Sequence, residues 1–301
     1  MKFAQETANL SVNFGPKPLF RIPFLASVCT DHFADLKLPV DIQDNGSEVS
    51  IFPSIPCDPE SHTVLRTENG KIYYSPKTFP HYVTDFNVDF ETYLNSFGAK
   101  TKSTLRRKVR KFVDSAGPDC FRQFKSPEEL LEFHAQAREI SKLTYQENLL
   151  DHGLPDTPEF KQKMIALAEK DQVRAYILYM QGNPAAYLYC PVRDSILYYD
   201  LLGYDPEYRT LSAGTVLQYL AFEQLFSEKQ FRAFDFEEGE GQHKRQFATR
   251  RVDCCSLFVF KRSLKARIYI SLNYLFARMT AGTLWFLDKT GLRQRVRQSL
   301  R

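Results

Sequence analysis

The segment 173–204 constrains the fold more than any other part of the chain, because it contains three consecutive strand-like stretches. These are VRAYILYM (173–180), PAAYLYCPV (184–192) and SILYYDLLGY (195–204), and each is rich in Tyr, Leu, Ile or Val, which favour β-strands. The short sequences QGNP and RD separate them, and connections of this length join antiparallel neighbours. The pattern therefore predicts a three-stranded antiparallel meander.

Helices are expected around the meander, because several stretches carry the signals that begin a helix. Ser126 is followed by a proline and, three positions along, by Glu129, which is the pattern of a capping box. Thr157 stands before a second helix of this kind, and Ser212 before a long one in SAGTVLQYLAFEQLF. We expect the hydroxyl of Ser212 to cap that long helix.

Two further strands complete the pattern after the long helix. They are FRAFDF (231–236) and DCCSLFVFK (253–261), with a helical turn in HKRQFATR between them. From Ser126 the order is helix, helix, three strands, helix, strand, short helix, strand, which predicts a mixed α/β (α+β) domain.

The first part of the chain reads as short strands and loops, with strands expected at 48–55 and 71–76. Asp89 is expected to cap a short helix. A basic helix follows over 103–114, which ends at Gly117.

Length and cysteine usage indicate the class of protein. A chain of 301 residues is comfortable for two hydrophobic cores. The six cysteines form no CxxC pattern, so we expect buried free thiols in a reducing compartment and no metal site. No signal-peptide core and no run of about 18 apolar residues is present, which predicts a cytoplasmic protein.

Two basic blocks stand out in a chain whose net charge is +4. Residues 262–301 contain nine Lys or Arg and one acid, and residues 100–111 contain seven Lys or Arg and no acid. Such blocks attract phosphates, nucleic acid or anionic lipid, although a solvated helix face is an equally good interpretation.

The basic tail 262–301 is also amphipathic. An apolar stripe at helical spacing is formed by Ile268, Leu272, Leu275 and Met279. The tail either packs on the core and exposes its arginines, which we favour, or makes a peripheral contact with the inner face of an anionic membrane.

The element order and three motifs resemble the GNAT acyltransferase fold. The motifs are RAYILYMQGNPAAYLY, YYDLLGYDPEYRTLSAGTVLQYLAFEQLF and RAFDFEEGEGQHKRQFA. They resemble CelD-type proteins of bacterial polysaccharide biosynthesis clusters, which are related to the FemAB aminoacyl transferases of peptidoglycan synthesis. The likeness covers roughly residues 100–250 and departs from the family pattern at Ala213 for proline, Glu237 for glycine and His243 for tyrosine.

The resemblance also implies a domain organisation. Relatives of this kind have tandem GNAT-like halves, so we expect a degenerate half over 1–99 and the acyltransferase domain over 100–261. A basic helical tail over 262–301 completes the chain.

In the GNAT fold, the pyrophosphate of acyl-CoA is held at a helix N-terminus, where amide groups and the helix dipole favour an anion. The sequence RTLSAGT resembles the family's phosphate loop R-x-x-G-x-G, with a serine in place of the first glycine. An ordinary capped helix is the alternative interpretation. The residues that the resemblance implies for donor binding are Arg209, Leu211, Ser212, Ala213, Gly214 and Thr215.

Acyl transfer needs a base for the acceptor's proton and a group that stabilises the oxyanion. Asp235 lies in a strand between Phe234 and Phe236, so it is either the base or a buried structural aspartate that fixes the following loop. Glu237, Glu238 and Asp200 are other candidates for the base. Lys244 matches the lysine of the family's closing motif, which implies that it neutralises a phosphate or the developing oxyanion; the alternative is a scaffold role in which it pairs with Asp235. His243 is given no role.

These features predict an acyltransferase that moves an acyl group from acyl-CoA to an amine or hydroxyl of a sugar or cell-envelope precursor. The phosphates of that acceptor are expected to contact Arg106, Arg107 and Arg110. One alternative is an aminoacyl-tRNA-dependent transferase of the FemAB kind, the only case in which nucleic acid would be a partner. Another is a non-catalytic, membrane-peripheral component of a biosynthetic complex. The sequence leaves the acceptor, the acyl length and the oligomeric state open.

Overall fold

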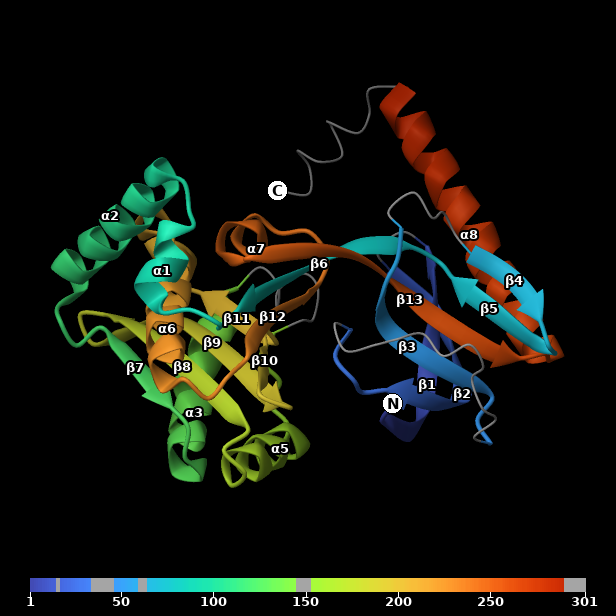
Figure 1. Cartoon of the computed structure of the whole chain (residues 1–301), viewed down its shortest axis with the longest axis horizontal. Coiled ribbons are helices and arrows are strands. Elements are labelled where there is room, and N and C mark those ends of the chain that lie inside the picture. The colour runs from blue at the N-terminus through green and yellow to red at the C-terminus, as the bar shows by residue number, and fades with distance from the viewer. Residues whose placement is uncertain (15–16, 34–45, 59–63, 145–152, 290–301) are drawn as a thin grey trace. The chain divides into compact units, whose positions relative to one another are not determined.

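The computed structural model describes residues 1–14, 17–33, 46–58, 64–144 and 153–289 (Figure 1). The chain divides into two compact units. Unit 1 consists of Met1–Pro80 and Val252–Arg301, and unit 2 consists of His81–Arg251.

This division differs from the domain limits expected at residues 99 and 261. The helix at Phe90–Asn95 packs within unit 2, and most of the strand Arg250–Lys261 belongs to unit 1 with the N-terminal strands. That residues 1–99 form a degenerate GNAT-like half remains a prediction.

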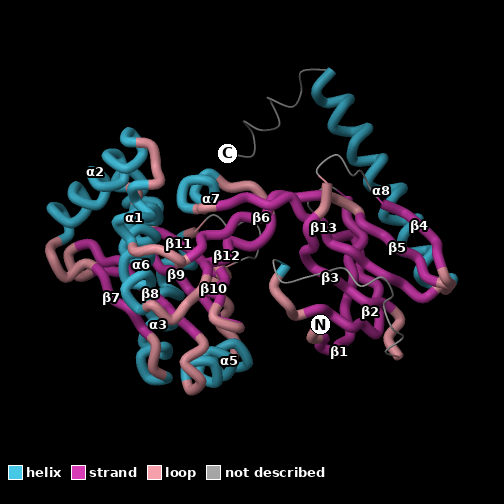
Figure 2. The backbone as a smooth tube through the Cα atoms, in the orientation of Figure 1, coloured by secondary structure: helices cyan, strands magenta, loops and turns pink. Residues whose placement is uncertain are grey.

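Unit 2 contains a mixed sheet with the strand order β6-β12-β10-β9-β8-β7 (Figure 2). β10 and β12 are parallel, whereas the other neighbours in this order are antiparallel. β6 enters unit 2 at His81. The strands are β6 (Thr78–Asp85), β7 (Phe121–Phe124), β8 (Val173–Met180), β9 (Asn183–Arg193), β10 (Ile196–Tyr198), β11 (Leu201–Tyr204) and β12 (Ala233–Glu238).

The predicted meander is present, but its third strand is broken in two. β10 pairs with both β9 and β12, whereas β11 pairs with β9. The break falls at Tyr199 and Asp200, and the Tyr199 amide donates a 2.8 Å hydrogen bond to the Asp235 carbonyl. Beyond this bond, β11 and β12 form no strand pairing among the described residues, so the two strands separate there.

Helices cover both faces of the sheet because side chains on a strand alternate between its faces. On β8, Tyr176 and Leu178 join the core cluster that contains α6, whereas Ala175 and Ile177 join the cluster that contains α3 and α5. The first face carries α1 (Phe90–Asn95), α2 (Ala99–Ala116) and α6 (Ala213–Glu228), and the second carries α3 (Pro127–Leu143) and α5 (Pro158–Ala168).

Most predicted helix starts are confirmed by their hydrogen bonds. Ser126 and Glu129 form the capping box of α3, and the Thr157 hydroxyl accepts from the third amide of α5 at 3.3 Å. Asp89 caps α1 through a 2.7 Å bond from an amide of its first turn. The basic helix α2 is longer than the predicted 103–114 and ends as expected at Gly117 (φ 99°).

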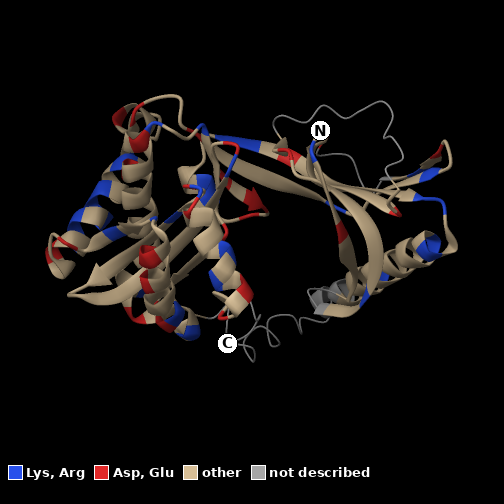
Figure 3. Cartoon of the chain, turned by 90° about the horizontal axis from the view of Figure 1, so that it is seen from below, with Lys and Arg blue, Asp and Glu red and all other residues tan. Residues whose placement is uncertain are grey.

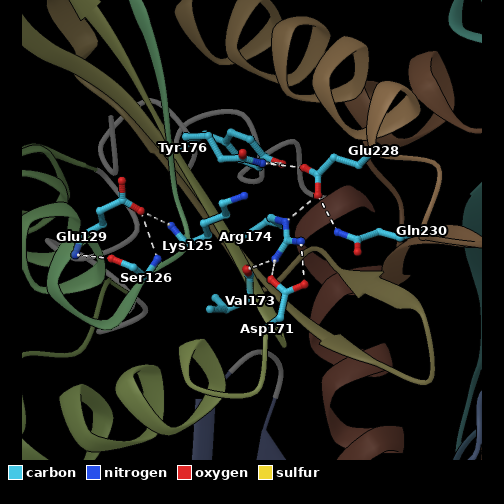
Figure 4. A network of polar contacts seen from close by, with 10 residues as sticks. Lys125, Ser126, Glu129, Asp171, Val173, Arg174, Tyr176, Glu228 and Gln230 are labelled. Carbon is cyan, nitrogen blue, oxygen red and sulfur yellow. Dashed lines mark hydrogen bonds and ion pairs between the residues drawn. The ribbon is translucent and has the colours of Figure 1, made fainter.

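The far end of α6 is tied to β8 by a buried ionic network (Figure 4). Arg174 is 1% exposed and donates from Nε to Glu228 at 2.9 Å and from Nη1 to Asp171 at 2.7 Å. Gln230 donates to the same Glu228 carboxylate at 2.7 Å. A buried charge must be paired in this way, so the network fixes where α6 ends against the sheet.

Unit 1 contains strands that pack against the C-terminal helix. Its core includes Val12, Phe24, Phe260, Tyr269 and Ile270. The elements are β1 (Phe3–Phe14), β2 (Lys17–Cys29), β3 (Val49–Pro56), β4 (Val64–Glu68), β5 (Lys71–Ser75), β13 (Arg250–Lys261) and α8 (Leu264–Lys289).

The tail is helical as expected over Leu264–Lys289, but its packed face differs from the predicted stripe. Tyr269 and Ile270 are buried, whereas Ile268, Leu275 and Met279 are 47%, 53% and 49% exposed. Among the described helices, none is long and apolar enough to cross a membrane. None of the six cysteines forms a disulfide, and five of them are buried.

Candidate active site

A cavity of about 590 Å³ opens at the N-terminus of α6. It is bounded by β11, the short helix η2 (Pro206–Leu211), the first turns of α6 and part of α7 (Gln242–Phe247). The lining residues are Thr144, Tyr199, Leu202, Gly203, Tyr204, Pro206, Arg209, Ser212, Ala213, Gly214, Thr215, Gln218 and His243.

The cavity collects five of the six residues expected to bind the donor. Arg209, Ser212, Ala213, Gly214 and Thr215 line it, whereas Leu211 packs against the core. Sequence reasoning missed Tyr199, Gln218 and His243. They lie in three separate segments of the chain, so no local sequence pattern indicated that they share a cavity.

Ser212 does not cap α6 with its hydroxyl, contrary to the expectation from the sequence. Its backbone is left-handed (φ 58°, ψ 40°), whereas a side-chain N-cap needs extended backbone. The turn is held instead by main-chain bonds, because the Ser212 carbonyl accepts from the Thr215 and Val216 amides at 2.9 and 3.0 Å. The Ala213 and Gly214 amides at the start of α6 therefore donate no bond to this side chain, and they can face an anion.

The glycine after Ala213 is not required by the protein's own packing. A Cβ at Gly214 would meet Leu202 and Tyr204 side chains at 3.5 Å, which is an ordinary contact. Both of these side chains belong to the cavity lining. Because Gly214 has no Cβ, its backbone leaves space on the side that faces the cavity.

Asp235 is a buried carboxylate that contacts His81 and Glu237. It is 2% exposed, and its Oδ1 lies 2.5 Å from Nε2 of His81, which is itself 5% exposed on β6. The same Oδ1 accepts the amide of Glu237 at 2.6 Å, so Asp235 holds the loop after β12. Phe234 and Phe236 are buried in the core cluster, as the strand alternation predicted. These contacts fit the structural alternative considered from the sequence, the catalytic role of Asp235 stays a prediction, and His81 is a partner that the sequence did not indicate.

Glu237 follows in a bulge of β12 with left-handed backbone (φ 58°). A residue other than glycine costs on the order of 1–2 kcal/mol in this region, which gives a physical reason for the glycine that the CelD-like pattern has here. Burial raises the pKa of the Glu237 carboxyl to about 7, together with the charges of Asp200 and Asp235, against the opposing effect of Arg193 and Lys244.

Asp200 lies at the break between β10 and β11. Burial raises the pKa of its carboxyl, against the effect of Lys163 and Arg193. Asp200 and Glu237 both reach solvent and are close enough that the charge of Asp200 acts on Glu237. The structure thus brings three of the four candidate carboxylates, Asp200, Asp235 and Glu237, close to one another, and the pKa of Glu237 is raised to about 7. None of these three is among the residues that line the cavity.

His243 and Lys244 come from the short helix α7. The His243 ring lies 5.3 Å from the Tyr199 ring, and its pKa is lowered by burial and by the charge of Lys244. The Lys244 ammonium donates to the Glu238 carbonyl at 2.7 Å, and burial lowers its pKa. The lowered pKa favours the neutral form of the His243 ring at the cavity wall. Lys244 connects α7 to the loop after β12 through its bond to Glu238.

The arginines expected to bind the acceptor do not line this cavity. Arg106 forms a two-pronged ion pair with Glu91 at 2.8 and 2.9 Å, and Arg107 and Arg110 are exposed on α2. In unit 2 the charged residues lie mostly on helices, while the strands carry few (Figure 3).

A second hollow, of about 800 Å³, lies at the start of α2 and beside α7. Lys100, Lys108 and Arg245 contribute its cations. Among the described residues, no group of three side chains suited to a metal ion occurs.

Residues 99–245 match the family model described as an acetyltransferase (GNAT) domain. The matched region is just under half of the chain, and the GNAT fold expected from the sequence is confirmed for that region. No curated protein matches the chain.

Several solved structures are similar in fold. The L-PGS from Bacillus licheniformis has 15% identity and a TM-score of 0.46 over 76% of this chain and 73% of its own. FemX has 13% identity and a TM-score of 0.46 over 66% and 64%. A C-terminal domain from Agrobacterium fabrum has 11% identity and a TM-score of 0.45 over 67% of this chain, which spans 65% of that domain's length. With TM-scores below 0.5, these likenesses carry no inference about fold or function.

Proposed function

We propose that this GNAT domain transfers an acyl group from acyl-CoA to an amine or hydroxyl of a sugar or cell-envelope precursor, as its resemblance to the CelD type implies. The observation that carries the proposal is the cavity at the start of α6. It is lined by Arg209, by the uncapped first turn of the helix and by the bare backbone of Gly214. Together these provide a cation, free amides and a dipole for the phosphates of the donor.

Glu237 is the proposed general base. A carboxyl with a pKa of about 7 is half ionised at neutral pH, which suits it to accept a proton in the transition state. It takes the proton of the acceptor's amine or hydroxyl as that group attacks the thioester carbonyl. The carbon–sulfur bond then breaks, the CoA thiolate leaves, and the proton on Glu237 returns to solvent or to the thiolate.

Asp235 and Lys244 have positioning roles in this scheme. Asp235 holds the Glu237 amide, and Lys244 holds the Glu238 carbonyl, so both ends of the bulge are fixed. The Lys244 charge also opposes the rise in the pKa of Glu237. Asp200 acts in the opposite direction, because its negative charge favours the protonated form of Glu237.

The test is release of free CoA thiol from a panel of acyl-CoAs with amino-sugar and hydroxyl acceptors. Thiol release that depends on both substrates, and that falls at least a hundredfold in Glu237→Gln, supports the proposal. The neighbouring, exposed Glu238→Gln is the matched control and should retain activity. Absence of CoA binding to the wild-type protein would refute the acyl-CoA proposal.

An aminoacyl-tRNA donor is the second proposal for the same fold. The basic hollow with Lys100, Lys108 and Arg245 favours it, because several cations together bind a phosphate backbone. Retention of aminoacyl-tRNA that weakens steeply with added salt, without retention of CoA, would favour this donor. CoA binding without thiol release for any acceptor would instead favour the non-catalytic alternative.

A further inference from the structure

Gln218 is a buried polar side chain in the wall of the cavity. It lies on α6 four residues after Gly214, on the same face of the helix, and is 1% exposed. Both Nε2 and Oε1 of its amide are buried, and neither has a hydrogen-bond partner among the described residues.

Such an amide is uncommon in a folded protein. The great majority of buried side-chain polar atoms are hydrogen bonded, because an unsatisfied one loses its bonds to water without replacement. Gln218 leaves two such atoms unsatisfied in one side chain, at a point where the cavity meets the helix. A leucine would fill this volume without that cost, so the packing of α6 does not account for the glutamine.

The position along the helix limits what can pair with this amide. Four residues of α-helix rise about 6 Å, so Gln218 lies roughly that far along the axis from the level of Gly214. The cavity extends from Gly214 to Gln218. A ligand whose phosphates lie at the first turn, and whose arm follows the cavity toward Gln218, would place the part of the arm next to the phosphates against this amide. A primary amide offers one donor side and one acceptor side, which matches the carbonyl and N–H of a secondary amide.

We propose that Gln218 determines donor specificity by hydrogen bonding to a secondary amide in the arm that links the donor's phosphates to its acyl group. This inference rests on the proposed function, because it assumes that the phosphates lie at Arg209 and Gly214. It assigns to Gln218 the recognition of an amide-bearing arm. In CoA that arm is the pantetheine chain, which carries two amides.

The experiment measures the affinity of CoA and of ADP by calorimetry for the full chain and for Gln218→Leu. ADP retains the pyrophosphate and the adenosine of CoA but has no amide arm. We expect Gln218→Leu to weaken CoA binding about tenfold and to leave ADP binding unchanged. The matched control is Gln224→Leu on the exposed side of α6, which should alter neither affinity.

A readout in the absence of ligand separates recognition from folding. Gln218→Leu removes two unsatisfied buried atoms, so its melting temperature without ligand should equal or exceed that of the wild type. If this variant fails to fold, Gln218→Met, which is closer in shape, takes its place in the same measurement.

The outcomes distinguish the inference from the function on which it rests. No binding of CoA or ADP by the wild type refutes the proposed function and, with it, this inference. Normal CoA affinity in Gln218→Leu overturns the inference alone and leaves acyl-CoA as the donor. Equal loss of CoA and ADP affinity overturns it as well, because that result assigns Gln218 to the shape of the phosphate loop.

Discussion

The pH dependence of acyl transfer follows from the bulge that carries Glu237. Its carboxyl has a pKa raised to about 7 by burial and by the charges of Asp200 and Asp235. A base with this pKa is about one-tenth ionised near pH 6 and about nine-tenths ionised near pH 8. We therefore expect kcat/KM to rise about tenfold over this interval, whereas a glutamate with an ordinary pKa would give a flat profile.

The assay is thiol release at limiting acceptor over that pH interval, with the wild type, Glu237→Gln and Glu238→Gln. Glu237→Gln should lose most of the activity and the rise with pH, and Glu238→Gln should keep both. His243 titrates below its ordinary value, because burial and Lys244 lower its pKa, so it contributes little to a rise centred on pH 7. A flat wild-type profile, or a rise that persists in Glu237→Gln, would refute the assignment of the base.

The same carboxyl affects stability with a defined sign. Its folded-state pKa of about 7 exceeds the ordinary 4.5, so between these values the folded state holds more protons than the unfolded state. The stability contributed by Glu237 is therefore present below the unfolded pKa and is lost as pH rises through 7. Glu237→Gln should gain stability relative to the wild type as pH rises over this window, as urea unfolding at several pH values can measure.

Three further predictions concern other parts of the molecule. Gly214→Ala should fold normally, because the added Cβ makes only ordinary contacts, yet it should weaken CoA binding in a calorimetric titration by occupying the side on which phosphate approaches. Arg174→Met should lower the free energy of unfolding in urea by about 3 kcal/mol or more, because it leaves Glu228 without its buried partner. The control is Arg122→Met, in which loss of the exposed Arg122–Glu132 ion pair should cost about 1 kcal/mol or less. Peripheral membrane contact through 262–301 predicts sedimentation with anionic vesicles that Leu275→Glu reduces, and equal sedimentation of both proteins would contradict it.

The sequence predicted those features that depend on neighbouring residues. The capping box of Ser126 and Glu129 and the cap at Thr157 are formed within one helical turn, so their signals are local. The alternation around Asp235 was likewise readable, because period two follows from the strand itself. The motif RTLSAGT is contiguous in the chain, and five of the six residues that it indicated line one cavity; that they bind phosphate stays a prediction.

Features that depend on distant residues were not predictable in this way. The partner of Asp235 is His81, 154 positions away, and no local pattern connects them. The break after Tyr198 depends on which strand pairs with each half, and β12, the partner of β10, begins 29 residues after β11 ends. The left-handed backbone of Ser212 and Glu237 contradicts the usual preferences of both residue types, so local propensity pointed away from it.

The division of the chain has a consequence for the order in which the protein is made. Unit 2 is one uninterrupted segment, His81–Arg251, whereas unit 1 needs both Met1–Pro80 and Val252–Arg301. Synthesis on the ribosome runs from the N-terminus, and domains generally fold as units. The whole of unit 2 is therefore synthesised, and free to fold, before β13 is available to pair with β3. A chain that stalls between the two events would hold a complete unit 2 and a unit 1 that lacks β13 and α8.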